Sequence, residues 1–358
     1  MRHCNNAIFA LLFAAAFSLP AQKPPTQQAP ANPPGQAPSL TVDRDPVRAP
    51  SGPGPTAPSG VEKEHGQYVL RTDVEEVSLN ATVLNSSGQL VQNLTQNDFQ
   101  VFEDGTKQNI ISFQHSDVPV SIGLVVDNSG SMSRKRPAVN KSALDLIEAS
   151  NPNDEAFVVN FSDEAFIDQD FTSDVAKLRD GLSHIESRGG TALYDAVVAS
   201  ADKLAADAHR PKQVLIIITD GEDNASTLNL EQTIRRVQAL SGPVIYTIGL
   251  LFGDEMSRAE VRHAHRALEM LSTETGGIAF FPKSMEQVDE IAAEVARDIR
   301  SQYTIGYHST KPTSQPGFRR IQVIADQNGH KLNVRTRTGY FPSPNRKQTT
   351  RAANTPTP

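Results

Sequence analysis

The chain has almost no cysteine, since Cys4 is the only one among its 358 residues. Cys4 precedes an apolar run, whereas a cysteine used for lipid attachment would follow such a run, so the sequence does not support a lipid anchor. If the segment that carries Cys4 is removed, the mature chain has no thiol. Disulfides, thiolate catalysis and cysteine metal ligands are then all excluded.

The sequence also has no excess of positive charge. Lys and Arg number 34 against 41 Asp and Glu, for a net charge of -7, which gives no electrostatic case for nucleic-acid binding. Beyond the N-terminal region, no run is long and apolar enough to cross a bilayer. We therefore expect no nucleic-acid partner and no integral membrane span once the N-terminal segment is cleaved.

The N-terminus itself has the pattern of a secretory signal peptide. Arg2 precedes an apolar run over residues 7–19, which is shorter than the roughly 20 residues that a membrane span needs. Pro20 and Ala21 follow the run. We predict a signal peptide over residues 1–21 and an exported protein in the periplasm, in the cell envelope or outside the cell. An uncleaved anchor is the alternative.

Composition divides the remaining chain. Residues 22–65 are dense in Pro, Gly, Gln, Ala and Ser without apolar periodicity, so we predict a disordered linker there, and a disordered tail over residues 343–358. Residues 66–117 and 302–342 show strand patterns, for example the apolar–polar alternation over residues 77–83. Each β segment is too small to be stable alone. We therefore predict that the two pair into one smaller β-sandwich-like domain.

Residues 118–301 alternate strand and helix patterns. Four continuous apolar runs are typical of parallel strands buried on both faces: 122–126, 156–159, 214–218 and 244–248. Five apolar residues lie on one face of a later helix: Val288, Ile291, Ala292, Val295 and Ile299. The fold class is therefore α/β, with a doubly wound, mostly parallel, Rossmann-like sheet inserted between the segments of the smaller β domain.

Short oxygen-bearing side chains follow two of these strands. Asp127 ends the first run, and Ser129 and Ser131 come directly after it, with Gly130 between them, where we expect glycine to allow a tight turn. Asp220 follows the run over residues 214–218 in the same way. Because sites in open α/β sheets form beyond the carboxyl ends of strands, we expect these side chains to meet.

A third segment adds one more oxygen donor. Gly189 and Gly190 precede Thr191 at the apparent start of a helix. The combined set has carboxylates and hydroxyls but no sulfur and no imidazole. Such donors suit Mg²⁺, Ca²⁺ or Mn²⁺ and argue against zinc or copper.

In their order and spacing, these segments resemble the von Willebrand factor type A (VWFA) domain and its metal-ion-dependent adhesion site (MIDAS). The strings are Asp-x-Ser-x-Ser at 127–131, Gly-Gly-Thr at 189–191 and Thr-Asp-Gly at 219–221. The flanking strings at 98–105 and 337–341 are similar to a VWFA-related family of acidobacterial type. The resemblance covers most of the chain outside the signal and the linker.

The resemblance implies a non-enzymatic protein with one divalent cation, for which we expect Mg²⁺, with Mn²⁺ or Ca²⁺ as alternatives. The residues that match the family's metal positions are Asp127, Ser129, Ser131, Thr191 and Asp220. In the family the hydroxyls bind metal directly, and the aspartates bind directly or through water. A protein partner's acidic side chain would complete the coordination, as in cell adhesion or the assembly of an envelope complex.

Two other functions remain open. A metal-free structural scaffold is one. The other is a Mg²⁺-dependent phosphatase-like hydrolase, although such enzymes need a second acid where Ser129 stands. A serine hydrolase would need a Gly-x-Ser-x-Gly elbow, which the sequence lacks. The partner's identity and the oligomeric state are left open.

Several charged residues near the motifs have two interpretations. Arg134, Lys135 and Arg136 form either a basic rim or a solvated helix face. Three acidic residues could support the site or lie free at the surface: Asp195, Glu222 and Asp223. His263 and His265, two positions apart, would point away from each other on a helix and are expected at the surface.

Overall fold

A computed structural model describes residues 76–149, 151–184, 187–240, 242–252 and 256–342. It also gives the backbone of three short strands nearer the N-terminus: β1 (Thr41–Val42), β2 (Glu62–Glu64) and β3 (Gln67–Val69). The predicted signal peptide, the predicted tail and most of the predicted linker lie outside the described residues, so those domain limits remain predictions. None of the described helices is long and apolar enough to cross a membrane.

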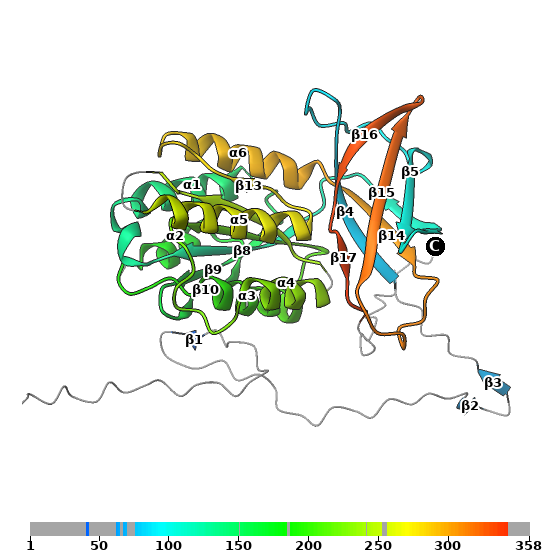
Figure 1. The fold of residues 1–358 in the computed structure, drawn as a ribbon, viewed down its shortest axis with the longest axis horizontal. Helices are drawn as coiled ribbons and strands as arrows, with labels where there is room; N and C mark the ends of the chain where they lie inside the picture. The colour runs from blue at the N-terminus through cyan, green and yellow to red at the C-terminus, as the bar shows by residue number, and fades with distance from the viewer. Residues whose placement is uncertain are drawn as a thin grey trace, which may run out of the picture. The chain divides into compact units, whose positions relative to one another are not determined.

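The central sheet has the strand order β1-β10-β9-β8-β11-β12-β13, and Figure 1 shows β8, β9 and β10 among the surrounding helices. Its members after β1 are β8 (Val120–Asp127), β9 (Glu155–Phe161), β10 (Ala165–Thr172), β11 (Lys212–Thr219), β12 (Val244–Gly249) and β13 (Ala279–Phe280). Strands β9, β8, β11, β12 and β13 are parallel, whereas β10 runs antiparallel to β9 and β1 is parallel to β10. The four predicted apolar runs form β8, β9, β11 and β12. Every residue of β8, β9 and β12 is buried, as expected for strands covered on both faces.

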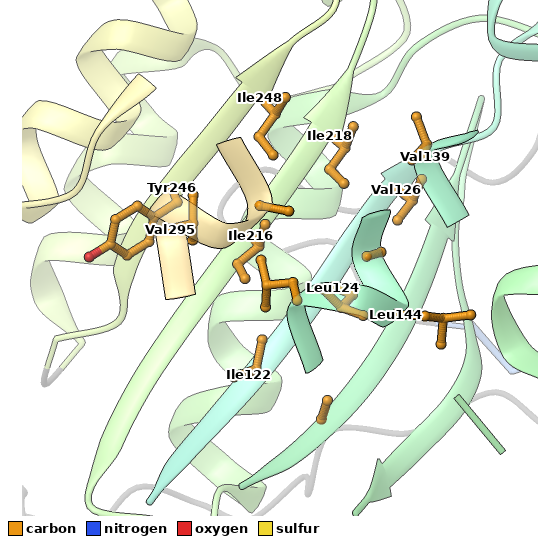
Figure 2. Close-up of a cluster of buried hydrophobic side chains, with 14 of the residues drawn as sticks. Ile122, Leu124, Val126, Val139, Leu144, Ile216, Ile218, Tyr246, Ile248 and Val295 are labelled. Carbon is orange, nitrogen blue, oxygen red and sulfur yellow. The ribbon is translucent and has the colours of Figure 1, made fainter. Parts of the chain in front are cut away.

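Helices cover both faces of this sheet. They are α1 (Arg136–Glu148), α2 (Val175–Ser183), α3 (Leu193–Asp207), α4 (Leu230–Ala239), α5 (Arg258–Thr275) and α6 (Gln287–Arg300). One core cluster contains side chains of α1, α2 and α6, and the other contains side chains of α3, α4 and α5. Figure 2 shows the first cluster, where Val139 and Leu144 of α1 and Val295 of α6 lie near strand residues such as Leu124.

The strand order reverses at β8, and this reversal positions the site. The chain passes from β8 to β9 on one side and later returns to place β11 on the other side of β8. Helices that leave two such strands in opposite directions open a crevice beyond the strands' carboxyl ends. Asp127 is the last residue of β8, and Asp220 follows the last residue of β11, so both aspartates lie at this crevice.

The second sheet is antiparallel and contains strands from both flanks of the α/β domain. Its order is β6-β5-β15-β16-β4-β14-β7, with β17 paired to β15. The strands are β4 (Glu76–Leu84), β5 (Phe99–Glu103), β6 (Thr106–Gln108), β7 (Ile110–Gln114), β14 (Tyr303–His308), β15 (Arg319–Gln327), β16 (His330–Arg335) and β17 (Gly339–Tyr340). Because β14 lies between β4 and β7, and β15 pairs with β5, the two flanks form one sheet.

This sheet folds over its own core. The ring of Phe99 on β5 lies 5.1 Å from the ring of Tyr303 on β14 and 5.4 Å from that of Phe113 on β7, although β5 is far from both in the strand order. The predicted fold class, an α/β sheet inserted between segments of a β-sandwich-like domain, is therefore confirmed.

Asp298 on α6 joins the two domains through a buried polar cluster. Its carboxylate accepts hydrogen bonds from Arg335 of β16 at 2.6 and 2.7 Å and from the hydroxyl of Tyr246 on β12 at 2.5 Å. Thr82 of β4 adds a longer bond of 3.4 Å. A charge pair of this kind costs desolvation, but removing one partner leaves the other buried without compensation.

The shared sheet makes a truncation test possible. A protein that ends at Ser301 lacks every partner that β14 and β15 give to β4, β5 and β7, so we expect residues 76–114 to become sensitive to protease while residues 120–250 stay protected. Limited proteolysis read by mass spectrometry measures both segments. Arg335→Met is the control, because it removes the side-chain hydrogen bonds to Asp298 and to the carbonyl of Gly276 but leaves the strand pairing intact. Full protection of residues 76–114 in the truncated protein would show that they fold alone.

Candidate functional site

The first loop holds Asp127 from two directions. Its side chain is fully buried. Oδ1 accepts a hydrogen bond from the backbone N–H of Ser129 at 2.8 Å, and Oδ2 accepts one from the hydroxyl of Thr219 at 2.5 Å. Thr219 is the last residue of β11, and the parallel register that pairs Ile218 with Val126 brings it beside Asp127. The strand pairing itself therefore orients this carboxylate.

A chain of hydrogen bonds then runs from the first loop to the third. The hydroxyls of Ser129 and Ser131 lie 3.3 Å apart, and the Ser131 hydroxyl donates to Oδ1 of Asp220 at 2.8 Å. Ser129 and Asp220 are each only 3% exposed, although both are polar and belong to loops. The structure thus brings together four of the predicted site residues, from segments about 90 positions apart in the chain.

Thr191 reaches the same place from the second loop. Its N–H donates to Oδ1 of Asn224 at 2.9 Å, and its carbonyl accepts from the N–H of Asn224 at 3.0 Å. Its hydroxyl faces the third loop, since a Cβ at Gly221 would lie 3.4 Å from it. Thr191 lines a cavity of about 230 Å³ together with Ser131 and Asp220.

The two positions before Thr191 have no room for a side chain, so both require glycine. Gly189 has φ +79, and a Cβ there would lie 2.1 Å from a carboxylate oxygen of Asp163. The same carboxylate accepts a hydrogen bond from the N–H of Gly190 at 2.7 Å. Gly130 differs, because its φ is not left-handed and a Cβ would meet no atom within 4 Å. Gly130 begins a short 3-10 turn, as a glycine that allows a tight turn would, but neither its φ nor the surrounding space requires glycine there.

The two aspartates repel each other in a buried place. Burial raises the pKa of Asp127 to about 6, and the charge of Asp220 adds to this increase, against the hydrogen bonds from Thr219 and Ser129 that lower it. A carboxylate buried next to another carboxylate is stabilised by any cation that comes between or beside them. Electrostatics at this crevice therefore favour a bound positive charge.

Two cationic side chains lie close to these carboxylates. The ammonium of Lys135 lies 2.5 Å from Oδ2 of Asp220. Arg136 is fully buried and donates to Asn160 at 2.7 Å and to the carbonyl of Leu182 at 3.2 Å. Burial lowers the pKa of Arg136 to about 10, while the nearby charge of Asp127 favours its charged form.

Only Arg134 in this run is exposed. Neither a basic rim nor a solvated helix face describes all three cations, so both interpretations were wrong for Arg136.

The nearby acidic residues have structural partners. Asp195 accepts hydrogen bonds from the backbone N–H groups of Thr227 and Leu228, which fastens the loop after Asp220 to α3. Asp223 accepts from the N–H of Tyr194 and from the Ser226 hydroxyl. These two residues hold the loops of the site in place instead of lying free at the surface.

Glu222 lies at the edge of the site rather than within its hydrogen-bonded cluster. It lines the cavity and lies 3.1 Å from Nδ1 of His263. His265 stacks on Phe281 with ring centroids 3.8 Å apart. The side chains of the two histidines are 69% and 48% exposed, which confirms that they lie at the surface.

Sequence reasoning did not predict the roles of three residues of the site. Thr219 and Asn224 fix the first and second loops, and Lys135 neutralises the third. Thr219 lies inside the Thr-Asp-Gly string but is the final residue of a buried strand, and a strand's end is not visible in the sequence alone.

The donor set fits a hard divalent cation. Three hydroxyls and two carboxylates converge, and such oxygens are the ligands of Mg²⁺, Mn²⁺ and Ca²⁺. Among the described residues, no group of three or more His, Cys, Asp or Glu side chains could hold a metal. Any cation here would therefore depend on hydroxyl oxygens as well as on Asp127 and Asp220.

Comparison with known families identifies the domain. Residues 122–222 match the family model of the von Willebrand factor type A domain. The chain therefore carries a domain of the von Willebrand factor type A family, as the motifs predicted. No curated protein matches the chain. The similarity of the flanks to the acidobacterial VWFA-related family stays a prediction.

Solved structures give weaker likenesses. A von Willebrand factor type A protein from Catenulispora acidiphila is 14% identical, with 67% of this chain and 73% of that chain covered and a TM-score of 0.45. The von Willebrand factor domain of a type V pili tip protein from Porphyromonas gingivalis is 14% identical, covering 51% and 97%, with a TM-score of 0.41. Proximal thread matrix protein 1 from the mussel byssus, with a zinc occupied MIDAS motif, is 18% identical, covering 56% and 50%, with a TM-score of 0.43.

The raised pKa of Asp127 predicts how the metal-free protein responds to pH. The folded protein holds a proton on Asp127 up to about pH 6, whereas the unfolded chain loses it near 3.8, so the free energy of unfolding should fall as pH rises between these values. Asp127→Asn removes this loss, because its amide keeps an acceptor for Ser129 and can donate to Thr219. We expect the variant to exceed the wild type by about 1 to 3 kcal/mol at pH 8.

Urea unfolding with chelator present, at pH 8 and pH 5, measures this difference. The advantage of Asp127→Asn should shrink at pH 5, where the wild-type carboxylate is largely protonated. A variant that is less stable than the wild type by the same amount at both pH values would show that the pKa of Asp127 is not raised in the folded protein.

Proposed function

We propose that the chain is an exported, non-enzymatic binding protein that uses one divalent cation to recognise an acidic side chain of a protein partner. The cation would be held by Asp127, Ser129, Ser131, Thr191 and Asp220. One observation carries the proposal: three loops distant in the sequence place their oxygens together at the reversal in strand order, around two buried carboxylates.

The chemistry of the site explains why the partner should be acidic. A divalent cation would supply Lewis acidity and two positive charges. The two carboxylates would match those charges in number but would leave coordination positions for another ligand. Hydroxyl ligands add no charge, so a carboxylate from outside would meet less electrostatic repulsion than at a site made of carboxylates alone. We expect Mg²⁺, with Mn²⁺ or Ca²⁺ as alternatives.

The acidic residues that line the cavity leave room for such a partner. Glu222 lies against His263, Asp223 is bonded to Ser226, and Glu260 accepts from the N–H of Ser257 at 2.7 Å as part of a helix cap. These hydrogen bonds hold the three carboxylates toward the chain. An incoming carboxylate would therefore meet the cation and Lys135 at the centre of the site, with these acids at its edge.

The predicted signal peptide supports an exported protein, in the periplasm, in the envelope or outside the cell, with a role in adhesion or in the assembly of an envelope complex. The hydrolase alternative has less support, because Ser129 stands where phosphatases of that type need an acid. Ser129 is itself tied to Ser131. A metal-free scaffold remains the second candidate, and metal binding separates the two.

Calorimetry with Mg²⁺, Mn²⁺ and Ca²⁺ tests the site. We expect the wild type to bind one cation, and Asp127→Ala and Asp220→Ala to lose at least about 100-fold in affinity, since each removes one of two charged ligands. Asp145→Ala is the matched control, because it removes an exposed aspartate of α1 that pairs with Lys141. Binding by Asp127→Ala as tight as wild type would refute the site.

A pull-down from an envelope extract tests the partner. A protein retained with the cation present should be lost on chelation and with Asp127→Ala, because both remove the bridging charge. Proteins retained equally under all conditions would favour the scaffold. Hydrolysis of a generic aryl phosphate that depends on Asp127 would favour the hydrolase instead.

A further inference from the structure

The ammonium of Lys135 is bound to Asp220, one of the proposed metal ligands, so a metal ion would have to compete with it. Its ammonium donates to Oδ2 of Asp220 at 2.5 Å, and the Ser131 hydroxyl donates to Oδ1 of the same carboxylate at 2.8 Å. Both oxygens of Asp220 are therefore engaged by the chain itself. The pair is largely buried, with the Lys135 side chain 14% exposed and the Asp220 side chain 0% exposed.

We propose that Lys135 is an internal counter-cation that competes with the divalent cation for Asp220 and so limits the metal affinity of the site. This inference rests on the proposed metal site. Like charges at short range repel strongly in a partly buried place, so a divalent cation beside Asp220 and an ammonium on Asp220 disfavour each other. Metal binding then requires Lys135 to leave Asp220 or to remain there at a cost.

The structure gives Lys135 a way to leave. It is one of the residues that line the cavity of about 230 Å³, and while paired with Asp220 its ammonium already lies 5.8 Å from the centre of the ring of Phe252, another residue of that lining. Its four-carbon stem can move the charge by several ångströms without moving the backbone. Lys135 can therefore exchange Asp220 for the cavity while α1 stays in place.

The neighbouring Arg136 cannot do the same. It is fully buried, and its guanidinium is held by the side chain of Asn160 and the carbonyl of Leu182. Its charge is a fixed part of the site, whereas the charge of Lys135 is movable. The competition therefore belongs to Lys135, and removing that one charge should free Asp220 for a metal.

Calorimetric titration with Mg²⁺ and Mn²⁺ compares the wild type with Lys135→Met and Lys141→Met. We expect Lys135→Met to bind each cation at least tenfold more tightly than the wild type. Lys141→Met should stay within about twofold, because it removes the same charge from α1, just after Lys135, where Lys141 pairs with exposed Asp145 and Asp289. Lys135→Gln keeps a hydrogen-bond donor without the charge, should show the same gain, and replaces Lys135→Met if that variant does not fold.

Thermal unfolding gives a second measurement. With chelator, Lys135→Met should melt below the wild type, because Asp220 has lost its counter-charge, and saturating Mg²⁺ should raise its melting temperature by more than it raises that of the wild type. Wild-type binding with equal or weaker binding by both Lys135 variants would overturn the competition and leave the metal site standing. No binding by any of the proteins would overturn the metal site and the competition together.

Discussion

Two carboxylates buried at the ends of adjacent parallel strands impose the main constraint on this domain. Strands β8 and β11 pair in parallel, so their carboxyl ends bring Asp127 and Asp220 to one crevice. Burial and mutual repulsion make both costly, as the raised pKa of Asp127 shows. Much of the surrounding loop structure compensates for this cost. The Thr219 hydroxyl and the Ser129 N–H donate hydrogen bonds to Asp127, while the Ser131 hydroxyl and the Lys135 ammonium donate to Asp220.

A second buried carboxylate with compensating partners lies where the α/β domain meets the flanking β domain. Asp298 is a buried carboxylate on α6 whose negative charge is met by Arg335 of the β domain and whose lone pairs are met by Tyr246 and Thr82. Burial and this neighbouring charge raise the pKa of Tyr246 well above its usual range, so it remains a neutral donor. Because β14 and β15 pair with strands from before the α/β domain, both ends of that domain are held in one sheet.

Much of the fold was predictable, because apolar runs mark strands that are buried on both faces and Asp127 and Asp220 follow two of them. The helical spacing of five apolar residues likewise predicted the inward face of α6, on which four of them are buried: Val288, Ala292, Val295 and Ile299, with Ile291 partly buried. Strand β10 was not predicted, since Ala165–Thr172 mixes apolar residues with Asp and Gln and pairs with β9 with register shifts. The burial of Arg136 was not visible either. It depends on Asn160 and Leu182, which only the folded chain brings near.

Charge balance connects these features to binding. Lys135 and Arg136 offset the charges of Asp127 and Asp220, while Glu222, Asp223 and Glu260 add negative charge around the cavity. A divalent cation held by Asp127 and Asp220 would add local positive charge, which an outside carboxylate can meet. A site with more carboxylate ligands would hold the metal more firmly and attract an outside carboxylate less. Few carboxylates, neutral hydroxyl donors and an internal lysine together favour a site in which cation and acidic partner stabilise each other.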